Sequence, residues 1–397
     1  MTIDTAVILA AGEGERLRPL TGHRPKPMLP AGDRPILEHV FDALLDAGLT
    51  DFHVVVGYGR DRVQEYFGHT YRDRPLTYHY QEQQLGTGHA VLRAEGAVDA
   101  TFLVVHGDQV VSADVFADVV AGYDTDASAT LGVLKTERAA QYGVVELEGD
   151  RVVDIHERPE TDHHRLLNLG VYAFTPAIFD EIAATSPSRG EIALPDTIDN
   201  LINADKTVRG VMTGGRWQDA TYPWDLLDLT TAVLDGGLVD IPERAEQVYV
   251  APTASVHDAA ILVPPVVLSP DAVVEAGAVV GPYVTVGRNA TVGAGVVVRQ
   301  SVIGEDTRVG RNATVIDAVT GQDVRLGDGA VIPGGPGDVR VGDRIHQDCR
   351  LGGVIADRTR LGGGVTVVPG TLIGPNVRAE PGTVVEGTVA KGERVVR

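Results

Sequence analysis

The 397-residue chain contains a single cysteine, Cys349. One thiol excludes an intrachain disulfide and any metal site built from several cysteines. No run approaches about eighteen consecutive apolar residues, and the N-terminus lacks the basic stretch followed by an apolar stretch that marks a signal peptide. We therefore expect neither a membrane span nor a signal peptide, and we expect a cytoplasmic protein.

Lysine is also scarce, since only Lys26, Lys135, Lys206 and Lys391 occur. The chain has 55 acidic and 34 basic residues, which gives a net charge of −21. Residues 1–240 contain 38 acidic and 19 basic residues, whereas the remainder contains 17 and 15. Scattered acidic residues with few lysines indicate a solvated surface in a salty cytoplasm and suggest a halophilic organism. With no basic face visible in the sequence, we expect no nucleic-acid partner.

Up to about residue 235, short apolar runs alternate with longer amphipathic stretches. This alternation predicts the α/β class, with a mostly parallel sheet covered by helices on both faces, and the length favours two domains. Ligands of such sheets lie beyond the carboxyl ends of the strands. The expected strands are 5–10, 52–56, 77–80, 101–106, 129–134 and 169–174, and the expected helices are 36–47, 60–67, 88–94 and 113–121.

From about residue 248 the apolar residues recur every six positions. A period of six predicts one short strand per repeat and three strands per coil, which is a β-solenoid. The repeat resembles the left-handed hexapeptide β-helix of acyltransferases. The period fails between residues 332 and 350, where we expect an excursion loop that is either functional or a simple insertion. The inward positions are Leu268, Val274, Val280, Val286, Val292, Val298, Ile303, Val309, Val315, Leu361, Val367, Ile373 and Ala379.

The expected domains are residues 1–235 and 248–397, with a linker at 236–247. In the first of them, an apolar run opens into a glycine-bearing loop that is followed by Arg16 and Lys26. Gly12 and Gly14 would let backbone N–H groups point into one concavity, and the two cations would offset the charge of a triphosphate. A G-x-G sequence alone also fits an ordinary strand-to-helix turn.

The longer string L-A-A-G-x-G-x-R-L-x-P-L-T, followed by P-K-P-M-L-P, closely resembles the signature of the sugar-1-phosphate nucleotidylyltransferases. The resemblance implies a Rossmann-like nucleotidyltransferase domain. It also implies that Ala11, Gly12 and Gly14 bind the nucleotide and that Arg16 and Lys26 act in catalysis.

Residues 81–90 read Q-E-Q-Q-L-G-T-G-H-A and follow an expected strand. Thr87 would open the next helix as its N-cap. The resemblance implies in addition that Gln81, Gly86 and Thr87 contact a pyrimidine base. This motif is most similar to that of the N-acetylglucosamine-1-phosphate uridylyltransferases, so UTP is favoured. The dTTP of glucose-1-phosphate thymidylyltransferases comes second, because one methyl group gives a pocket little discrimination.

Asp108 follows an apolar run that would end at the edge of the sheet facing the phosphate loop. A carboxylate there suits Mg²⁺, although an aspartate in this place also fits a turn. The resemblance implies that Asp108 binds the metal and that Asp219, in a W-Q-D-A-T segment, is the second ligand. Thr221 stands where the family has glycine. Asp225 fits a helix cap better than a metal ligand.

Three short segments offer groups that read sugar hydroxyls: the backbone N–H of Gly143, the carboxylate of Glu157 and the carboxamide of Asn168. Each residue also fits a turn or a cap. The resemblance implies that these three contact the sugar and that Arg158 binds its phosphate. Many relatives have lysine at Arg158, which leaves the identity of the sugar open.

Together these motifs predict transfer of a nucleotidyl group from UTP or dTTP to a sugar-1-phosphate, with Mg²⁺ as cofactor. The products would be pyrophosphate and a UDP-sugar such as UDP-N-acetylglucosamine or UDP-glucose. Every candidate site residue precedes residue 236. The sequence therefore predicts that residues 1–240 alone catalyse the reaction.

Two further roles stay open for the solenoid. Hexapeptide helices of related bifunctional enzymes acetylate an amino sugar phosphate from acetyl-CoA with a histidine base. Here only His257 and His346 follow residue 250, neither in a matching context, and residues 312–321, where the base would lie, contain no histidine. Alternatively, the solenoid assembles the chain into a homotrimer or a higher homo-oligomer.

Overall fold

The computed structural model describes residues 3–136, 142–157 and 166–396. Contacts divide the chain into two compact units, which we describe one at a time. The first unit consists of Met1–Glu13, Pro25–Met28 and Ile36–Gln218, and the second of Gly14–Arg24, Leu29–Pro35 and Asp219–Arg397. Two short N-terminal segments therefore group with the C-terminal half of the chain, a division that the expected domain boundaries do not contain.

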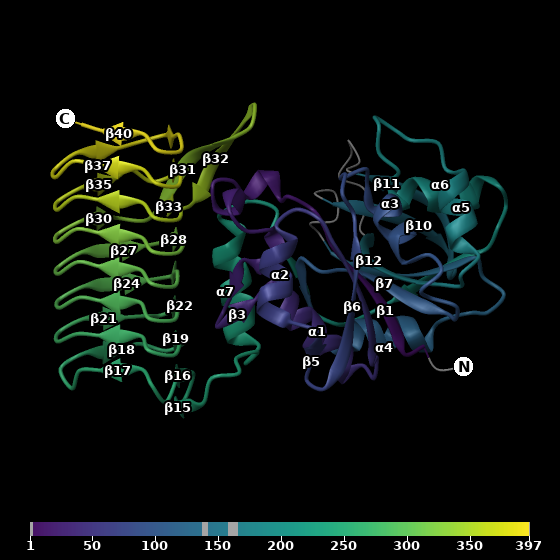
Figure 1. The fold of residues 1–397 in the computed structure, drawn as a ribbon, viewed down its shortest axis with the longest axis horizontal. Helices are drawn as coiled ribbons and strands as arrows, with labels where there is room; N and C mark the ends of the chain where they lie inside the picture. Colours follow the sequence, from purple (N-terminus) through teal and green to yellow (C-terminus); the bar gives the residue numbers. More distant parts are fainter. Residues whose placement is uncertain (1–2, 137–141, 158–165, 397) are drawn as a thin grey trace. The chain divides into compact units, whose positions relative to one another are not determined.

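A ten-stranded sheet forms the centre of the first unit (Figure 1). Its strands are β1 (Thr5–Ala10), β4 (Asp51–Val56), β5 (Thr70–Tyr71), β6 (Arg74–Tyr80), β7 (Phe102–His106), β9 (Ala129–Lys135), β10 (Gly143–Glu148), β11 (Arg151–Glu157), β12 (Leu166–Phe174) and β13 (Val208–Met212). Their order is β10-β11-β13-β9-β12-β7-β1-β4-β6-β5, and β10 also pairs with β12. Two short strands outside it are β8 (Gln109–Val111) and β14 (Trp217–Asp219).

The sheet is mixed rather than mostly parallel. Strands β6, β4, β1 and β7 run parallel to one another, but β12 runs antiparallel between β7 and β9. Strands β10 and β11 are also antiparallel, since only Gly149 and Asp150 join them. Parallel neighbours need a crossover of a dozen or more residues, so this short connection fixes an antiparallel pair.

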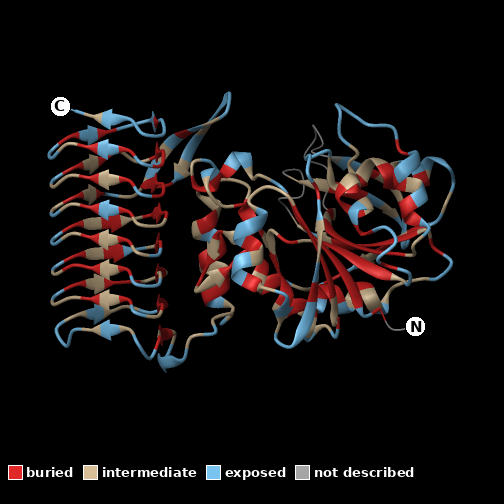
Figure 2. Ribbon diagram, in the orientation of Figure 1, coloured by how far each residue is buried: buried red, intermediate tan, exposed pale blue. Residues whose placement is uncertain are grey.

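Helices cover both faces of the sheet. Along β1, Ala6 and Ile8 belong to the apolar core beneath α1 and α4, whereas Val7 and Leu9 belong to the core beneath α3, α5 and α6. Side chains of a strand alternate between faces, so a strand that is buried throughout, as β1 is, fits a sheet covered on both sides (Figure 2). The helices are α1 (Ile36–Asp46), α2 (Arg60–Phe67), α3 (Thr87–Val91), α4 (Ala113–Ala121), α5 (Ile178–Ala184) and α6 (Leu194–Asn203), with 3₁₀ turns η3 (Lys26–Met28) and η4 (Leu92–Ala94).

All six expected strands and all four expected helices of this unit form, with the predicted helix 88–94 divided between α3 and η4. No helix in the described part of the chain is both long and apolar enough to cross a membrane.

The second unit contains a parallel β-helix with three sheets (Figure 1). The first sheet consists of β15 (Glu243–Ala245), β16 (Val248–Val250), β19 (Val266–Leu268), β22 (Val284–Val286), β25 (Ser301–Ile303), β28 (Ala318–Thr320), β33 (Gly353–Ile355), β36 (Thr371–Ile373) and β39 (Thr388–Val389). The second consists of β17 (Ser255–Val256), β20 (Val273–Val274), β23 (Thr291–Val292), β26 (Arg308–Val309), β29 (Arg325–Leu326), β34 (Arg360–Leu361), β37 (Arg378–Ala379) and β40 (Arg394–Val395). The third consists of β18 (Ile261–Leu262), β21 (Val279–Val280), β24 (Val297–Arg299), β27 (Thr314–Ile316), β30 (Val331–Ile332), β35 (Thr366–Val367) and β38 (Val384–Val385).

Every inward position that the period of six predicts is buried and belongs to one continuous core. Each complete coil contributes one strand to each sheet, and strands of successive coils pair in parallel, as Val266 does with Val284. The hexapeptide prediction is therefore confirmed residue by residue, and the arrangement is consistent with the left-handed β-helix that the repeat resembles. In the interval where the period fails, β31 (Pro336–Val341) and β32 (Arg344–Arg350) form an antiparallel hairpin.

The remaining elements of the second unit are η1 (Glu15–Leu17), η2 (Leu20–Gly22), β2 (Pro30–Ala31), β3 (Arg34–Pro35) and α7 (Asp225–Asp235). Helix α7 packs against β2 and against the coil strands β25 and β28. The Arg24 guanidinium lies 3.3 Å from the Asp357 carboxylate at a corner of the β-helix, and Arg34 pairs with Asp240 at 2.6 Å. The Arg24–Asp357 ion pair thus ties the first N-terminal segment to the β-helix, and the second segment packs on α7 and pairs with Asp240, which precedes the β-helix.

Candidate active site

The carboxyl ends of β1, β4 and β7 coincide in the first unit. Ala10 is in register with Val56, and Leu9 with His106. The loops that follow these strands therefore begin at one edge of the sheet, which is where α/β folds bind ligands. The loop after β1 begins with Ala11 and Gly12.

Close backbone packing supports the loop after β1. The carbonyl oxygen of Ala11 accepts the N–H of Tyr58 at 3.1 Å and the side-chain amide of Gln84 at 3.4 Å. A Cβ at Gly57 would lie 2.7 Å from the Gln81 carbonyl oxygen and 3.0 Å from Ala11, so only glycine fits there. A Cβ at Gly12, in contrast, would meet nothing within 4 Å, and the residue is exposed. This side of the loop is open to a ligand.

The two charged residues expected to act on phosphate and metal meet in the first unit. The Nζ of Lys26 lies 2.9 Å from the Oδ2 of Asp108, and Lys26 is only 9% exposed. Burial alone would raise the pKa of the Asp108 carboxyl, but the charges of Lys26 and His106 outweigh it and hold that pKa below its usual value. Asp108 is therefore ionised at neutral pH and faces a buried ammonium group.

Local packing fixes both partners. Gly107, just before Asp108, donates its N–H to the Leu9 carbonyl at 2.9 Å, so the chain leaves β7 alongside β1. Lys26 begins η3, and the preceding Pro25 packs over Gly59, where a Cβ would lie 2.7 Å from the proline ring. The lysine thus belongs to a constrained turn rather than to a free loop.

The expected sugar residues lie along the neighbouring strands of the same unit. Gly143 of β10 is in register with Glu157 of β11, and Val144 pairs with both His156 and Leu167. Asn168 lies next to Leu167 on β12. The structure therefore brings Gly143, Glu157 and Asn168 onto three neighbouring strands. Arg158 lies outside the described residues.

The Asn168 side chain has a structural task of its own. Its Nδ2 donates to the Tyr172 hydroxyl at 2.8 Å, and its Oδ1 accepts the N–H of Gly170 at 3.1 Å. These bonds close an irregularity in the β12 ladder between Asn168 and Tyr172. Gly170 has a φ of 70°, and a Cβ there would lie 2.6 Å from the ring of His106. His106 in turn lies 3.9 Å from Asp108, so the expected sugar and metal residues adjoin.

Gln81 and Gly86, expected to contact the base, form a buried network. The amide nitrogen of Gln81 lies 3.0 Å from the Gly86 carbonyl oxygen and 2.9 Å from Nδ1 of His89. Gly86 has a φ of 96°, and a Cβ there would lie 2.4 Å from the Ile192 carbonyl oxygen. Gln81 thus fixes the shape of the segment that carries the base-contact motif.

Thr87 is the expected N-cap of α3, but Gly86 occupies that position and provides no side-chain cap. The Thr87 hydroxyl instead accepts the N–H of Leu194 at 2.8 Å, which is the first residue of α6. Residues 192–194 pack closely against this segment, so the Thr87 hydroxyl bonds to a backbone N–H that is far away in the sequence.

In the second unit, the loop continues from Gly14 to η1. Gly14 has a φ of 65°, a left-handed conformation suited to glycine, and its carbonyl oxygen accepts the Thr21 hydroxyl at 2.9 Å. Arg16 is an exposed residue within η1.

Asp219, the expected second metal ligand, is 8% exposed and also lies in the second unit. The Thr221 hydroxyl donates to its Oδ2 at 2.7 Å, so the residue that replaces the family glycine holds the carboxylate. Asp225 accepts the N–H groups of Thr221 and Tyr222 at 2.9 and 2.7 Å. It is the first residue of α7 and not its N-cap, which corrects the expected cap, and it closes the turn that follows Asp219.

The hairpin of the β-helix braces this turn. The His346 ring lies 4.5 Å from the Tyr222 ring and 5.1 Å from the Trp224 ring, and these two aromatic rings stack at 4.7 Å. All of these contacts lie within the second unit. Asp219 and the Arg16 segment thus belong to one packed body with the β-helix.

Several contributors to the site escaped the sequence analysis. His106, Gln84 and the Gly57–Gly59 turn support the candidate loops, yet the sequence analysis assigned none of them a role, although Gln84 lies within the motif of residues 81–90. A glycine directly after a buried strand was the one usable signal for Gly57. Trp217, the first residue of the W-Q-D-A-T segment, donates its indole N–H to Gln109 at 3.0 Å and so fixes the residue next to Asp108.

An open glycine loop and an ionised carboxylate paired with lysine, at the carboxyl edge of an α/β sheet, are typical of enzymes that transfer phosphoryl or nucleotidyl groups. Two family models match the chain. One, described as "Nucleotidyl transferase", matches residues 5–236, and the other, described as "GMPPB C-terminal domain", matches residues 262–397. The chain therefore belongs to the nucleotidyl transferase family, which confirms the resemblance seen in the motifs.

Individual relatives agree with this assignment. A "Bifunctional protein GlmU" from Methanocaldococcus jannaschii is 35% identical over 245 residues, covering 61% of this chain and 57% of the relative. A "UTP--glucose-1-phosphate uridylyltransferase AglF" from Haloferax volcanii is 37% identical over 225 residues, covering 55% of this chain and 92% of the relative. The chain thus spans little more than half of the GlmU protein.

Among solved structures, a UDP-glucose pyrophosphorylase complexed with UDP-glucose matches with a TM-score of 0.53 and 23% identity. The match covers 59% of this chain and 99% of that chain. At this level of identity the likeness concerns the fold alone.

Proposed function

We propose that the protein transfers a uridylyl group from UTP to a sugar-1-phosphate. An oxygen of the sugar phosphate attacks the α-phosphorus of the nucleotide. A new oxygen–phosphorus bond forms as the bond from the α-phosphorus to the bridging oxygen breaks, and pyrophosphate leaves with the electron pair. The product is a UDP-sugar, and the exchange needs no covalent enzyme intermediate.

The observation that carries this proposal is the 2.9 Å contact between Lys26 and Asp108 beside the open loop at Gly12. Catalysis of such a transfer consists mainly of positioning and of neutralising phosphate charge. Lys26 would bind a phosphate oxygen of the nucleotide, and Arg16 would add a second cation. Ala11, Gly12 and Gly14 would supply the cradle, with Gln81, Gly86 and Thr87 beside the base.

Asp108 and Asp219 are the residues that would hold a Mg²⁺ ion. Asp108 fits a metal ligand because it is ionised and its nearest charged partner is a lysine that a phosphate could engage instead. Two carboxylates also match the preference of Mg²⁺ for few protein oxygens together with substrate phosphates and water. When bound, the ion would offset the charge that develops on the transferring phosphorus and on the departing pyrophosphate.

The sugar would lie against Gly143, Glu157 and Asn168, with Arg158 on its phosphate. Gly143 offers a backbone N–H at the start of β10, and Glu157 ends the strand paired with it. The Asn168 carboxamide already bonds to Tyr172 and Gly170, so it would contribute mainly by shaping the strand that faces the sugar.

Pyrophosphate release measured over a grid of four nucleoside triphosphates and five sugar-1-phosphates tests this proposal. We expect UTP to give the fastest turnover, dTTP to follow, and one sugar-1-phosphate to stand out. No release with any pair, in a protein shown to be folded, would contradict the reaction class. Faster release with ATP or GTP than with UTP would contradict the base assignment alone.

Among residues 248–396, no contact of either histidine favours acetyl transfer from acetyl-CoA. His257 accepts the N–H of Ala259 through its Nδ1 at 3.0 Å, which is a local turn contact. His346 packs against Tyr222 and Trp224, and burial, with help from Arg344, lowers its pKa. We therefore assign both histidines structural roles.

We propose that the β-helix also assembles the chain into a homotrimer or a higher homo-oligomer, and that the protein works in the cytoplasm of a halophilic cell. The acidic charge of residues 1–240 supports the halophilic setting. The repeat architecture supports the assembly. Light scattering in molar salt measures the mass directly. A monomeric mass at micromolar concentration would contradict it.

A further inference from the structure

A row of arginines runs along the second sheet of the β-helix. Strands β26, β29, β34, β37 and β40 each begin with arginine, and these five residues are in register from one coil to the next. The corresponding positions of the three preceding coils are Ser255, Val273 and Thr291. We call the five residues Arg308, Arg325, Arg360, Arg378 and Arg394 the arginine ladder.

The ladder faces outward. The residue after each of its first four arginines is Val309, Leu326, Leu361 or Ala379, all buried in the core of the β-helix. Because successive side chains of a strand point to opposite faces, the arginines lie on the solvent side, one strand spacing of about 4.8 Å apart. Like charges directly opposite one another on paired strands are destabilising. Such a row needs a source of negative charge.

The chain supplies only part of that charge. Arg360 pairs with Asp323 at 2.7 Å, and Arg394 pairs with Glu380, its Nε lying 3.0 Å from Oε1. Arg308 donates to oxygens of Asn289 and Thr307, which carry no charge.

Within residues 3–136, 142–157 and 166–396, neither Arg325 nor Arg378 forms an ion pair, and both are exposed. The last four arginines of the ladder are therefore matched by only two carboxylates, those of Asp323 and Glu380. Two positive charges remain without a partner.

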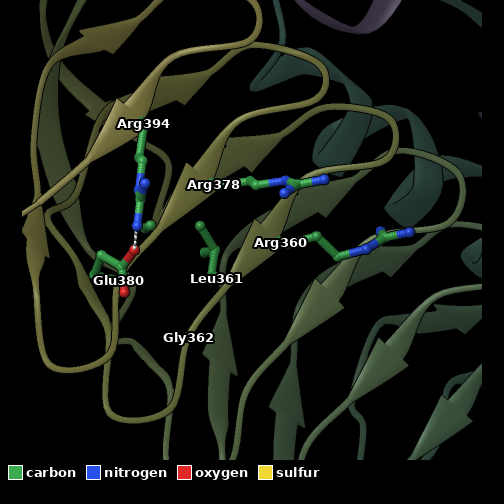
Figure 3. Close-up of a pocket in the computed structure, with 7 residues that line it drawn as sticks. Arg360, Leu361, Gly362, Arg378, Glu380 and Arg394 are labelled. Carbon is green, nitrogen blue, oxygen red and sulfur yellow. Dashed lines mark hydrogen bonds and ion pairs between the residues drawn. The ribbon is translucent and has the colours of Figure 1, made fainter.

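A cavity of about 370 Å³ lies at this part of the ladder. Its charged lining consists of Arg360, Arg378, Arg394 and Glu380 (Figure 3). Figure 3 shows the side chains of Arg378 and Arg360 extending in the same direction, whereas Arg394 turns toward Glu380. The volume falls at the lower end of the range of about 300–1,000 Å³ found for small-molecule sites. The charge and size together define what the cavity can hold.

We propose that this cavity binds a phosphate-bearing small molecule, with Arg378 as its main ligand and Arg360 beside it. Among the charged residues of the lining, Arg378 is the one that no carboxylate of the described residues compensates, and a phosphate would supply the missing negative charge. A planar guanidinium group binds phosphate through paired, charge-assisted hydrogen bonds. Arg378 offers such a fork, and Arg360, whose guanidinium already bonds to Asp323, adds positive charge beside it. The site lies wholly within the β-helix, so it is separate from the residues assigned above to the transfer reaction.

Calorimetric titration of the full-length protein with inorganic phosphate, and separately with glucose-1-phosphate, tests the proposal at fixed ionic strength. We expect Arg378→Gln to weaken phosphate binding at the β-helix site by about tenfold, since a hydrogen bond to a charged group contributes about that much. Arg325→Gln, which removes a ladder charge outside the cavity lining, should weaken binding less. Because glucose-1-phosphate would also bind the transfer site, a larger loss of its affinity than of phosphate affinity in Arg378→Gln would identify an ester as the ligand of the cavity.

Arg340→Gln is the matched control, because Arg340 is an exposed arginine on strand β31 and not part of the ladder. It should leave the isotherm unchanged. Arg378→Gln should keep the wild-type turnover at saturating substrates, and its thermal midpoint without phosphate should be equal or higher, since a like-charge contact is removed. Identical isotherms for wild type and Arg378→Gln, or an equal loss in Arg340→Gln, would overturn the proposal.

Discussion

The β-helix and the α/β unit differ in how far apart in the sequence the residues lie that determine their structure. In the β-helix, each inward residue contacts neighbouring coils, so a period of six determines both strand position and burial. In the α/β unit, Asp108 lies beside Lys26 and His106, and Gly170 packs on the ring of His106. These residues lie on separate turns and strands. Regular architecture is therefore readable from local pattern, whereas the candidate site depends on non-local packing.

Charge divides the chain in a similar way. Residues 1–240 have 38 acidic and 19 basic residues, but the remainder has 17 and 15. The near balance of the second part conceals the arginine ladder, because its rungs are 16 to 35 residues apart and look unremarkable in a linear count. Only the register of the coils turns five scattered arginines into a basic face, which the sequence analysis did not anticipate.

Truncation after residue 240 removes the β-helix and tests most severely whether the α/β unit catalyses the reaction without it. The sequence predicts an active remainder, but the structure predicts a loss of at least about 100-fold, because misplacement of about 1 Å costs that much. The truncation removes Asp357, the ion-pair partner of Arg24, and His346, which packs on Tyr222 and Trp224. Pyrophosphate release and circular dichroism in molar salt measure activity and folding.

A point variant keeps this test decisive if the truncated chain does not fold. His346→Ala in the full-length protein removes only the ring contacts on the turn after Asp219. We expect wild-type secondary structure and a several-fold loss of turnover. We also expect a weaker affinity for Mn²⁺, used in place of Mg²⁺, in direct titration. Full activity of the truncated protein would show that the β-helix does not position the site.

Within the α/β unit, Asp108→Asn should reduce turnover by at least about 100-fold, as removal of one strong electrostatic contact does. The side-chain volume barely changes, so circular dichroism should stay that of the wild type. Asp114→Asn, an exposed residue in the first turn of α4, is the control and should retain its activity. More than a tenth of the wild-type rate in Asp108→Asn, at saturating Mg²⁺, would remove Asp108 from the metal site.

Ile303→Ala in the β-helix tests whether its stability is local. Ile303 is 1% exposed and lies between Val286 and the next coil, so truncation to alanine should lower the free energy of unfolding by about 2–5 kcal/mol. Hydrogen exchange should rise mainly in β22, β25 and β28, while turnover changes little. Ile345→Ala, at a 56% exposed site, should shift stability by less than about 0.5 kcal/mol. Uniform loss of protection across both units would contradict local coupling.

The smallest expected effect concerns Asp225, whose pKa burial raises to about 6 despite the N–H groups it accepts. The folded state then binds more protons than the unfolded state between pH 3.8 and about 6. Stability from this residue is therefore present at low pH and lost as the pH rises through that window, by up to about 3 kcal/mol. Denaturant unfolding of wild type and Asp225→Asn at pH 4.5 and 7 should show this difference, and parallel pH profiles would contradict it.

Most strands and helices of the α/β unit follow from local pattern, and the missing ones have physical explanations. Strand β10 alternates buried and exposed residues only in part, and β11 follows after the two-residue turn at Gly149 and Asp150, so neither forms a long apolar run. Helix α6 begins within a segment that contains Pro195, which weakens its helical signal although proline is tolerated in a first turn. Its place is fixed by Thr87, whose hydroxyl accepts the Leu194 N–H.

By itself, the sequence determined the α/β class, the coils of the β-helix and the motif residues of the nucleotidyl transferase family, because period, apolar runs and short motifs are local properties. The tertiary structure decided that Lys26 faces Asp108 and that Gly12 lies open. It also decided that Asp219 belongs to the body of the β-helix and that the ladder arginines adjoin. These relations depend on strand order, register and close backbone packing between residues far apart in the chain, which no local pattern encodes.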